Sequence, residues 1–284
     1  MGLGFGSRPE AGKREAQAMW LNGVKGMTLE VDGVGMDCAR FGSGSKALVL
    51  VPGLSLRDVK GAELPLAYLY RCFAKEHTVY ILDKRSVVPE GYTIRDLADD
   101  AARAMEQLGL SNADVFGVSQ GGMIAQYLAI DHPQLVHKLV LSVTASRSNR
   151  VMEEAVRGWV KMVESGRYEA LVMDIFERMY SEDYLKRYHL LFPILTRLGR
   201  PKNPARFIAL AKACLTCNAY PELHKITCPT LVIGGEQDHV LTGEASREIA
   251  AALQCELYMY EDLGHSAYEE APDHNQRIVQ FLER

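Results

Sequence analysis

The sequence predicts one α/β domain built on a mostly parallel sheet, and three observations lead to this expectation. Two strand patterns separated by Asp32-Gly33 open the chain as a hairpin. Short apolar runs then alternate with segments of helical periodicity, as β-α repeats do. Residues 147–222 interrupt this alternation with helical patterns alone. Because the strand pattern resumes near residue 230, we interpret this stretch as an insertion into the domain.

The expected strands are short apolar runs bounded by turn residues. The first two, 27–31 and 36–41, flank the Asp32-Gly33 turn. The third, 47–51, is apolar on both faces and ends at Pro52-Gly53, which fits a buried parallel strand. The remaining strands are expected, in chain order, at 78–82, 113–118, 139–143, 230–233 and 256–260.

Helices are expected between these strands. Residues 93–108 repeat apolar side chains with a 3.6-residue period, with Thr93 placed to cap the start and Gly109 the end. Further helices of the core are expected at 121–130, 243–253 and 270–282. The patterns within the insertion predict helices at 150–164, 168–180, 181–198 and 204–219.

Composition indicates an ordinary globular protein and argues against several classes of partner. The chain has 284 residues, of which 48% are hydrophobic, and 32 Lys and Arg against 36 Asp and Glu give a net charge of −4. With no basic excess, we expect no nucleic-acid or membrane partner. No apolar run reaches the ~18 residues of a membrane span. Residues 1–26 lack the apolar stretch of a secretory signal and are expected to form a tail or short helix, so a cytoplasmic location is expected.

The six cysteines do not suggest a disulfide framework or a metal site. Cys214 and Cys217 form a CxxC motif, but no second pair and no HxxxH follows it. We therefore expect two cysteines on one helix face in a reducing compartment, and no metal.

The most informative motif is Gly117-Val118-Ser119-Gln120-Gly121, which fits G-x-S-x-G. An apolar strand pattern precedes it and an apolar helix pattern follows, which is the context that a nucleophilic serine on a strand-to-helix turn requires. The two glycines leave room around the turn. Read alone, Ser119 could instead be an ordinary helix N-cap.

A serine nucleophile needs a base and an acid that orients it, and both are expected later in the chain. The strand at 230–233 leads to Asp238, and the strand at 256–260 leads to His265. We predict Asp238 as the orienting acid and His265 as the general base. Glu236 is an alternative acid and His239 an alternative base, whereas the other six histidines have no motif context and are expected to be structural or exposed.

Acyl transfer also requires two N–H donors for the oxyanion. Gln120, which follows the nucleophile, is expected to supply one backbone N–H. The loop Pro52-Gly53-Leu54-Ser55 follows the strand at 47–51, and Leu54 is the candidate for the other.

With these motifs in place, the sequence from about residue 27 to 284 resembles the α/β-hydrolase superfamily. The resemblance rests on Pro52-Gly53-Leu54, Asp83-Lys84-Arg85, the Ser119 motif, the Asp238 loop and Gly264-His265. It implies the α/β-hydrolase fold, with a mostly parallel eight-stranded sheet flanked by helices. The core would be residues 27–146 and 223–284, and residues 147–222 would form a helical cap, or lid. Two departures are notable: Pro52 stands where the family usually has a histidine that braces the oxyanion loop, and Ser86 and Val88 stand where glycines are common.

Within the superfamily the chain is similar to lidded serine esterases, enol-lactonases and C–C bond hydrolases. We expect a serine hydrolase that cleaves a small carboxylic ester through an acyl-enzyme, without cofactor or metal. The alternatives are a C–C bond hydrolase or enol-lactonase with the same triad, and a ligand-binding receptor that retains it. Cap residues Trp159, Met162, Phe176 and Phe192 are candidates for an apolar substrate pocket. Three cap arginines are candidates for holding a carboxylate, namely Arg147, Arg150 and Arg157.

Overall fold

The computed structural model describes residues 23–192, 196 and 199–284. Most of the expected N-terminal tail, residues 1–22, lies outside this part. Where the description begins, the first strand, β1 (Lys25–Val31), starts two residues earlier than the sequence pattern indicates.

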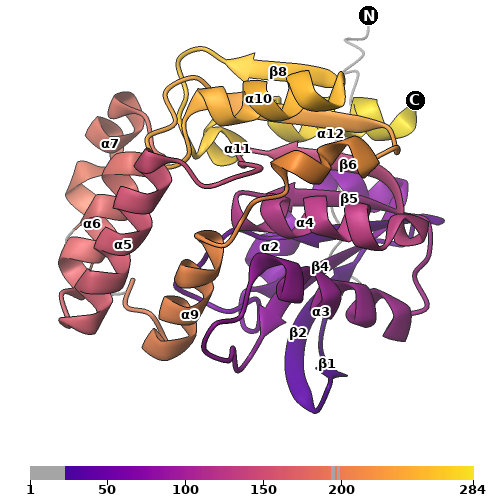
Figure 1. The fold of residues 1–284 in the computed structure, drawn as a ribbon, viewed down its shortest axis with the longest axis horizontal. Helices are drawn as coiled ribbons and strands as arrows, with labels where there is room; N and C mark the ends of the chain where they lie inside the picture. Colours follow the sequence, from indigo (N-terminus) through magenta and orange to yellow (C-terminus); the bar gives the residue numbers. More distant parts are fainter. Residues whose placement is uncertain (1–22, 193–195, 197–198) are drawn as a thin grey trace, which may run out of the picture.

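The eight expected strands form one sheet in the order β1-β2-β4-β3-β5-β6-β7-β8. β1 and β2 pair antiparallel, as do β2 and β4, and every other pairing is parallel. Figure 1 shows the β1–β2 hairpin and β8 at opposite edges of the sheet. After β1 the strands are β2 (Val34–Phe41), β3 (Lys46–Val51), β4 (His77–Arg85), β5 (Ala113–Val118), β6 (Val136–Ser142), β7 (Thr230–Gly235) and β8 (Glu256–Tyr260).

The β1–β2 hairpin turns as the sequence predicts. Asp32 and Gly33 have φ of 50° and 74°, the two positive values that a tight two-residue hairpin turn requires.

Helices cover both faces of the sheet. On one face, buried residues of α3 (Ile94–Gln107), α4 (Gln120–Asp131) and α10 (Gly243–Leu253) pack with Val49 and Val51. On the other face, α2 (Glu63–Leu69), α11 (Ala267–Glu270) and α12 (His274–Glu283) pack with Leu48 and Leu50. Successive side chains of β3 point to opposite faces of the sheet, and because helices bury both faces the strand is apolar throughout. Four short 3-10 segments complete the chain, at Arg71–Lys75, Pro133–Leu135, His189–Leu191 and Tyr220–Lys225.

Several helix boundaries differ from the sequence expectation. The helix expected at 270–282 is α12, which begins only at His274; Glu270 is the last residue of the separate helix α11, and Pro272, which has no backbone N–H to donate, lies between the two. The helix expected at 204–219 ends at Cys214, and α2 was not expected at all. Thr93 caps the start of α3, as predicted, and its side chain and backbone form reciprocal hydrogen bonds with Asp96. At the other end the C-cap is Leu108 instead of the expected Gly109, which follows it with φ of 68°.

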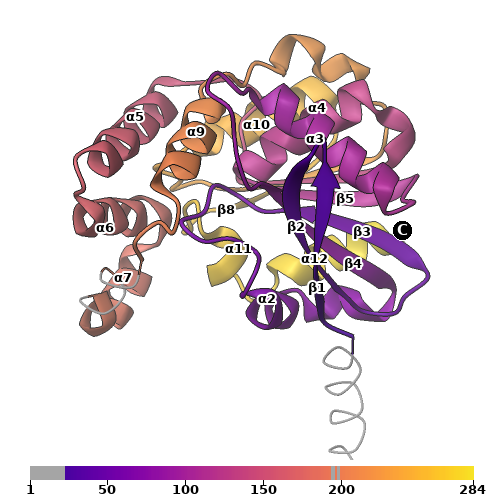
Figure 2. The same ribbon diagram turned by 90° about the horizontal axis from the view of Figure 1, so that it is seen from below.

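The inserted segment is helical where it is described. It contains α5 (Arg150–Glu164), α6 (Tyr168–Met179), α7 (Glu182–Tyr188) and α9 (Pro204–Cys214). These helices lie together at one side of the sheet in both ribbon views (Figures 1 and 2). The expected helix at 181–198 is α7 followed by a 3-10 turn, and its last part falls largely outside the described residues.

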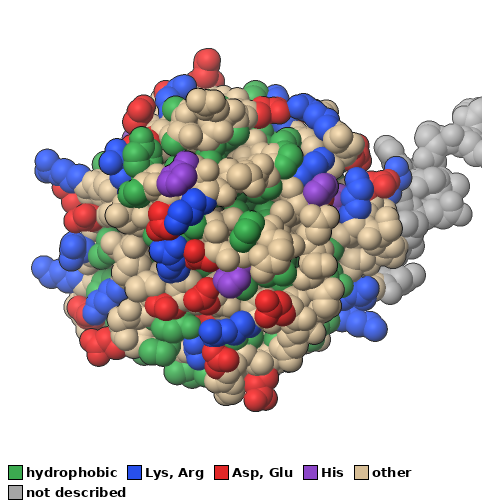
Figure 3. Space-filling view, turned by 45° about the vertical axis from the view of Figure 1, so that its right-hand side comes forward, with side chains coloured by type: hydrophobic (Ala, Val, Ile, Leu, Met, Phe, Trp, Pro, Cys, Tyr) green, Lys and Arg blue, Asp and Glu red, His purple; other side chains and the backbone are tan. Residues whose placement is uncertain are grey.

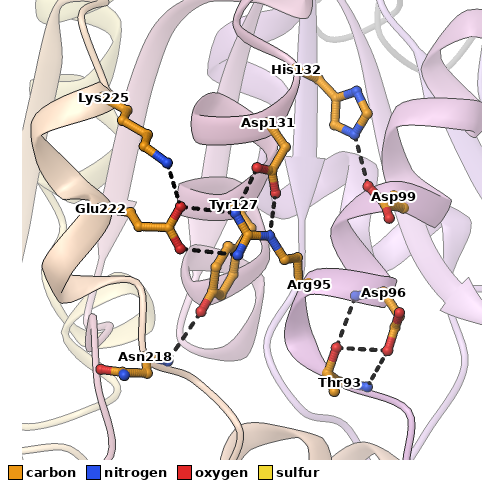
Figure 4. A network of polar contacts seen from close by, with 10 residues as sticks. All are labelled: Thr93, Arg95, Asp96, Asp99, Tyr127, Asp131, His132, Asn218, Glu222 and Lys225. Atoms are coloured by element: carbon orange, nitrogen blue, oxygen red, sulfur yellow. Dashed lines mark hydrogen bonds and ion pairs between the residues drawn. The ribbon is translucent and has the colours of Figure 1, made fainter.

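A polar network fixes the chain where it returns from the insertion to the core (Figure 4). Arg95 on α3 forms hydrogen bonds to Asp131 on α4 and to Glu222, at distances of 2.7 to 3.0 Å. Its guanidinium also lies 4.9 Å from the centre of the Tyr127 ring, whose hydroxyl accepts a bond from the Asn218 N–H. The segment after α9 is therefore attached to two core helices.

The surface carries both signs of charge. On the face drawn in Figure 3, Lys and Arg side chains are interspersed with Asp and Glu. The six cysteines are free thiols. Within the described part of the chain, no helix is long and apolar enough to cross a membrane.

Candidate active site

Ser119 occupies the sharp turn between β5 and α4. Its φ is 53°, in the region that non-glycine residues seldom adopt, and its N–H donates to the Ser142 carbonyl at 2.9 Å. Its position is that of the helix N-cap, yet its side chain makes no capping hydrogen bond. The hydroxyl is therefore available to another partner, unlike that of an ordinary N-cap serine.

Close backbone packing makes glycine necessary beside this turn. A Cβ at Gly121 would lie 1.9 Å from the Val51 carbonyl oxygen, and one at Gly117 would lie 2.5 Å from the Gly121 carbonyl oxygen. The α4 terminus thus lies directly against the end of β3, where the Pro52-Gly53-Leu54 loop begins.

The loops after β7 and β8 bring Asp238 and His265 to Ser119. His265 Nε2 lies 2.9 Å from Ser119 Oγ, and its Nδ1 lies 2.8 Å from Asp238 Oδ2. Both side chains are buried. The predicted acid, base and nucleophile thus form one continuous hydrogen-bonded chain, in the arrangement that activates a serine.

The electrostatic surroundings keep Asp238 ionised. Burial by itself would raise the pKa of this carboxyl, but the neighbouring His265 and the N–H groups of Leu241 and Val240 outweigh it and hold the pKa below the usual range. The two N–H groups bond to Oδ1 at 2.8 and 2.7 Å. Asp238 is therefore suited to orienting an imidazole and stabilising its charged form.

The alternative acid and base lie elsewhere. The Glu236 carboxylate pairs with Arg247 at 2.8 Å on an exposed surface. The His239 carbonyl accepts a bond from Arg178, and no contact joins its ring to the Ser119 chain among the described residues. The other six histidines all contact a carboxylate, a carbonyl or a side-chain oxygen, as expected of structural residues: His77, His132, His137, His189, His224 and His274.

The two candidate oxyanion donors flank the serine. Gln120 begins α4 directly after Ser119. Leu54 follows Gly53, where a Cβ would lie 3.2 Å from Ser119 Cβ. Neither backbone N–H donates to another described residue. Both remain available for an oxygen bound beside Ser119.

A cavity of about 520 Å³ opens at Ser119 and His265. Trp159 and Phe176, two of the predicted pocket residues, line it. Its wall is mostly apolar, with further contributions from Leu54, Leu66, Leu69, Ile175, Met179, Phe207 and Val240. A cavity of this size and character accommodates a small apolar group next to the serine.

The other predicted pocket residues lie outside this cavity. Met162 packs against the hydrophobic core, and Phe192 lines separate hollows with Met173 and His189. Met162 follows the apolar stripe of α5, which faces the hydrophobic core as well as the cavity. The three arginines that were candidates for holding a carboxylate pair with nearby glutamates instead of lining the cavity: Arg147 with Glu248, Arg150 with Glu154 and Arg157 with Glu153.

Sequence reasoning missed the charged residues around the site. Arg57 and Glu269 line the cavity, and Glu269 accepts a hydrogen bond from Tyr180 at 2.5 Å. Lys84 reaches the Pro52-Gly53 loop, and Arg206 from α9 holds the backbone around it. No motif marks Arg57, Arg206 or Glu269, and the Asp83-Lys84-Arg85 segment gives no sign that Lys84 reaches the Pro52-Gly53 loop, because tertiary packing brings these side chains to the site. In the described part of the chain, no three His, Cys, Asp or Glu side chains gather as a metal site would require.

Comparison with known proteins gives the same fold. Residues 48–277 match the model of the alpha/beta hydrolase family. A 2-hydroxy-6-oxononadienedioate/2-hydroxy-6-oxononatrienedioate hydrolase of a Pseudomonas species is 28% identical over 196 residues, which are 66% of this chain and 69% of that protein. An alpha/beta hydrolase enzyme from a Medee basin deep-sea metagenome library superimposes with a TM-score of 0.80 at 21% identity, covering 91% of this chain and 98% of its own. The enol-lactonase of Burkholderia xenovorans gives a TM-score of 0.79 at 22% identity, covering 91% and 100%.

Proposed function

The chain belongs to the alpha/beta hydrolase family, and from this premise we propose that it is a serine hydrolase that cleaves a small carboxylic ester. The observation that carries the proposal is the chain of contacts from Ser119 Oγ through His265 to Asp238, at 2.9 and 2.8 Å. This is the arrangement in which a weak hydroxyl nucleophile gains a base of fixed orientation.

In the proposed reaction, His265 Nε2 accepts the proton of Ser119 as its oxygen attacks the ester carbonyl. Asp238 holds the Nδ1–H and stabilises the imidazolium. The N–H groups of Gln120 and Leu54 receive the oxyanion, a contribution worth about 3–4 kcal/mol per donor in a well-studied protease. The imidazolium then protonates the leaving alcohol, and a water activated by His265 releases the acid from Ser119.

The cavity supports a preference for an uncharged, apolar acyl group. Apolar side chains form most of its wall, and Glu269 adds a carboxylate that an anionic substrate group would approach unfavourably. Desolvation raises the pKa of Glu269 above its usual range, because it outweighs the hydrogen bonds from Tyr180 and Tyr268 that lower the pKa. Repulsion of an anionic acyl group would therefore grow as the pH rises.

The cavity wall also carries a positive charge, which favours a second candidate function. Arg57 lines the same cavity, and a guanidinium is the natural partner of a substrate carboxylate. The Pseudomonas relative is named for a dicarboxylate, and the Burkholderia structure is an enol-lactonase. C–C bond cleavage or enol-lactone opening by the same three residues is the alternative.

We also propose that residues 147–222 act as a cap over the site, with the core formed by residues 27–146 and 223–284. Trp159 and Phe176 of this segment form part of the cavity wall. The free thiols fit a reducing compartment, and we propose a cytoplasmic site of action on a small-molecule substrate.

The test is hydrolysis of p-nitrophenyl esters from acetate to decanoate by the wild type, by Ser119→Ala and by Ser43→Ala, an exposed serine far from the motif in sequence. We expect Ser119→Ala to lose about 10⁴-fold or more in kcat and Ser43→Ala to lose nothing. Turnover that survives in Ser119→Ala would refute the serine mechanism. A wild type inactive on every ester would favour the lactone or C–C substrate.

A further inference from the structure

Lys84, the penultimate residue of β4, is buried beneath the loop that carries Leu54. Its Nζ donates to the carbonyl oxygens of both Pro52 and Gly53, each at 2.6 Å. A buried ammonium that binds two consecutive carbonyls holds two successive peptide planes in place. A single hydrogen bond would hold only one of them.

The orientation of these planes decides where the Leu54 N–H points. In a trans peptide the C=O and the N–H lie in one plane and point in opposite directions from the C–N bond. The Gly53 carbonyl points at Lys84, so the Leu54 N–H of that peptide points away from Lys84. Gly53 itself lies against Ser119, with only 3.2 Å between Ser119 Cβ and a Cβ built on the glycine. The ammonium therefore sets the direction of a donor next to the nucleophile.

Position 52 explains why such a brace is needed here. Proline has neither a backbone N–H nor a polar side chain, so Pro52 cannot tie the loop to its surroundings as a histidine would. The only polar group that Pro52 offers is its carbonyl, and Lys84 binds it.

We propose that Lys84 is a positioning residue for the oxyanion hole, which holds the Pro52-Gly53-Leu54 backbone so that the Leu54 N–H meets the developing oxyanion. This inference rests on the proposed serine mechanism. Lys84 does not touch the substrate; it acts through the two peptide planes.

Arg206 supports this arrangement from α9. Its Nη2 donates to the Lys84 carbonyl at 2.7 Å and to Asp83 Oδ1 at 3.0 Å, so the end of β4 is held from a second side. The charged and titratable groups that influence the ammonium are Asp83 on its own strand and Arg206 and the Cys214 thiol on α9. Burial lowers the pKa of Lys84 to about 8, with Asp83 opposing this change and Arg206 adding to it.

Because Lys84 loses its proton near pH 8, the pH dependence of kcat also tests its role. Below pH 8 the Lys84 ammonium is charged and its hydrogen bonds to the two carbonyls are strong. Above pH 8 the side chain becomes a neutral amine, and these hydrogen bonds become weaker. We expect kcat of the wild type to fall as the pH rises through this region. Titration of Lys84 should not lower the melting temperature there, because the unfolded chain keeps the lysine proton to a higher pH than the folded protein and this contribution to stability rises with pH.

The experiment compares Lys84→Met with Lys138→Met. Lys138 is a matched control, because its Nζ also donates to two backbone carbonyls, those of Phe281 and Leu282, far from the cavity. On p-nitrophenyl butyrate we expect Lys84→Met to lower kcat about 10- to 100-fold with KM changed less than about 3-fold, and Lys138→Met to leave both unchanged.

Inhibition by an alkyl trifluoromethyl ketone isolates the oxyanion, since its hemiketal with Ser119 places a negative oxygen in the hole. We expect Lys84→Met to weaken this inhibitor by the same factor as kcat, and to leave the affinity of the corresponding methyl ketone unchanged. A variant that keeps kcat, the ketone affinity and the alkaline fall of the wild type would overturn the proposal. Equal weakening of both ketones would also overturn it, because that result indicates general damage to the cavity.

Failure of the proposed serine mechanism gives a different result from failure of the Lys84 proposal. If the wild type neither hydrolyses esters nor forms a hemiketal detectable by ¹⁹F NMR, the serine mechanism itself is wrong. If the wild type forms the hemiketal without turnover, the Lys84→Met comparison is made on hemiketal affinity alone. If Lys84→Met does not fold, the wild type decides: a flat kcat and a constant ketone affinity from pH 7 to 9.5 would refute the role of Lys84.

Discussion

Asp238 contacts His265 through one carboxylate oxygen only. Oδ2 lies 2.8 Å from His265 Nδ1, whereas Oδ1 accepts the backbone N–H groups of Val240 and Leu241. The two N–H groups therefore fix which oxygen faces the histidine. They also fix what any replacement at this position would present to the ring.

Asp238→Asn should place the amide oxygen against the two N–H groups and the amide NH₂ against His265. The ring would then have to present an unprotonated Nδ1 and a protonated Nε2, which cannot accept the Ser119 proton. We expect kcat for p-nitrophenyl esters to fall by about 10³- to 10⁴-fold. Glu236→Gln is the control, because Glu236 pairs with Arg247 away from the site; if it lost as much activity, Glu236 would be the acid.

Gly121→Ala should destabilise the fold, since its Cβ would lie 1.9 Å from the Val51 carbonyl oxygen and the backbone would have to move. We expect a loss on the order of 3 kcal/mol in the free energy of unfolding, measured by urea denaturation. Gly158→Ala, within α5, is the matched control. A Cβ there would meet nothing within 4 Å, and the helix should gain about 0.5–1 kcal/mol. A tolerated Gly121→Ala would show that α4 and β3 are less closely packed than the structure has them.

Phe176→Ala should enlarge the cavity and Phe192→Ala should not. The two rings are neighbours, with centroids 5.7 Å apart, but only Phe176 lines the cavity at Ser119. For Phe176→Ala we expect KM for p-nitrophenyl butyrate to rise about 5- to 10-fold, as lost apolar contact of roughly 1 kcal/mol implies, and longer esters to be preferred. Equal effects of the two substitutions would place Phe192 at the substrate as well.

Glu269→Gln should relax discrimination against anionic acyl groups, because it removes a carboxylate from the cavity wall. We expect kcat/KM for a p-nitrophenyl hemisuccinate, relative to the butyrate, to rise at least about 5-fold at pH 8. The gain should shrink as the pH is lowered, since desolvation raises the pKa of Glu269 and the wild-type carboxyl takes up a proton. The exposed Glu261→Gln should give no gain, and an equal gain there would indicate a general charge effect.

His274 should make stability depend on pH. Burial lowers the pKa of this ring from 6.5 to about 4, so the unfolded chain binds a proton in a range where the folded protein does not. The free energy of unfolding therefore falls as the pH drops from about 6.5 to 4, by about 3 kcal/mol in total. In His274→Gln we expect this part of the decrease to disappear in urea titrations between pH 7 and 4.5. If the free energy of unfolding fell with pH by the same amount in the wild type and in His274→Gln, this role of His274 would be contradicted.

The sequence alone was sufficient for the presence of the eight strands, the hairpin turn and the three residues of the Ser119 chain, whereas β4 (His77–Arg85) and β6 (Val136–Ser142) extend up to three residues beyond the expected 78–82 and 139–143. Each of these leaves a local signal: Asp32-Gly33 marks a hairpin, an apolar run marks β3, and Gly117 and Gly121 mark the strand-to-helix turn. Parallel strands end at one edge, so the loops with Asp238 and His265 could be assigned to the side of Ser119 before any coordinates.

Only the tertiary structure decided which other side chains meet the serine. Trp159 and Met162 lie three residues apart on α5 and both pack with the hydrophobic core, yet only Trp159 also lines the cavity. Glu269 has no motif around it, and the Asp83-Lys84-Arg85 segment does not indicate which groups Lys84 contacts. Their roles depend on the packing of β4 under the Pro52-Gly53 loop and of α11 beside Tyr180. Local periodicity determines that a side chain is buried, whereas its partner depends on contacts between elements far apart in the chain.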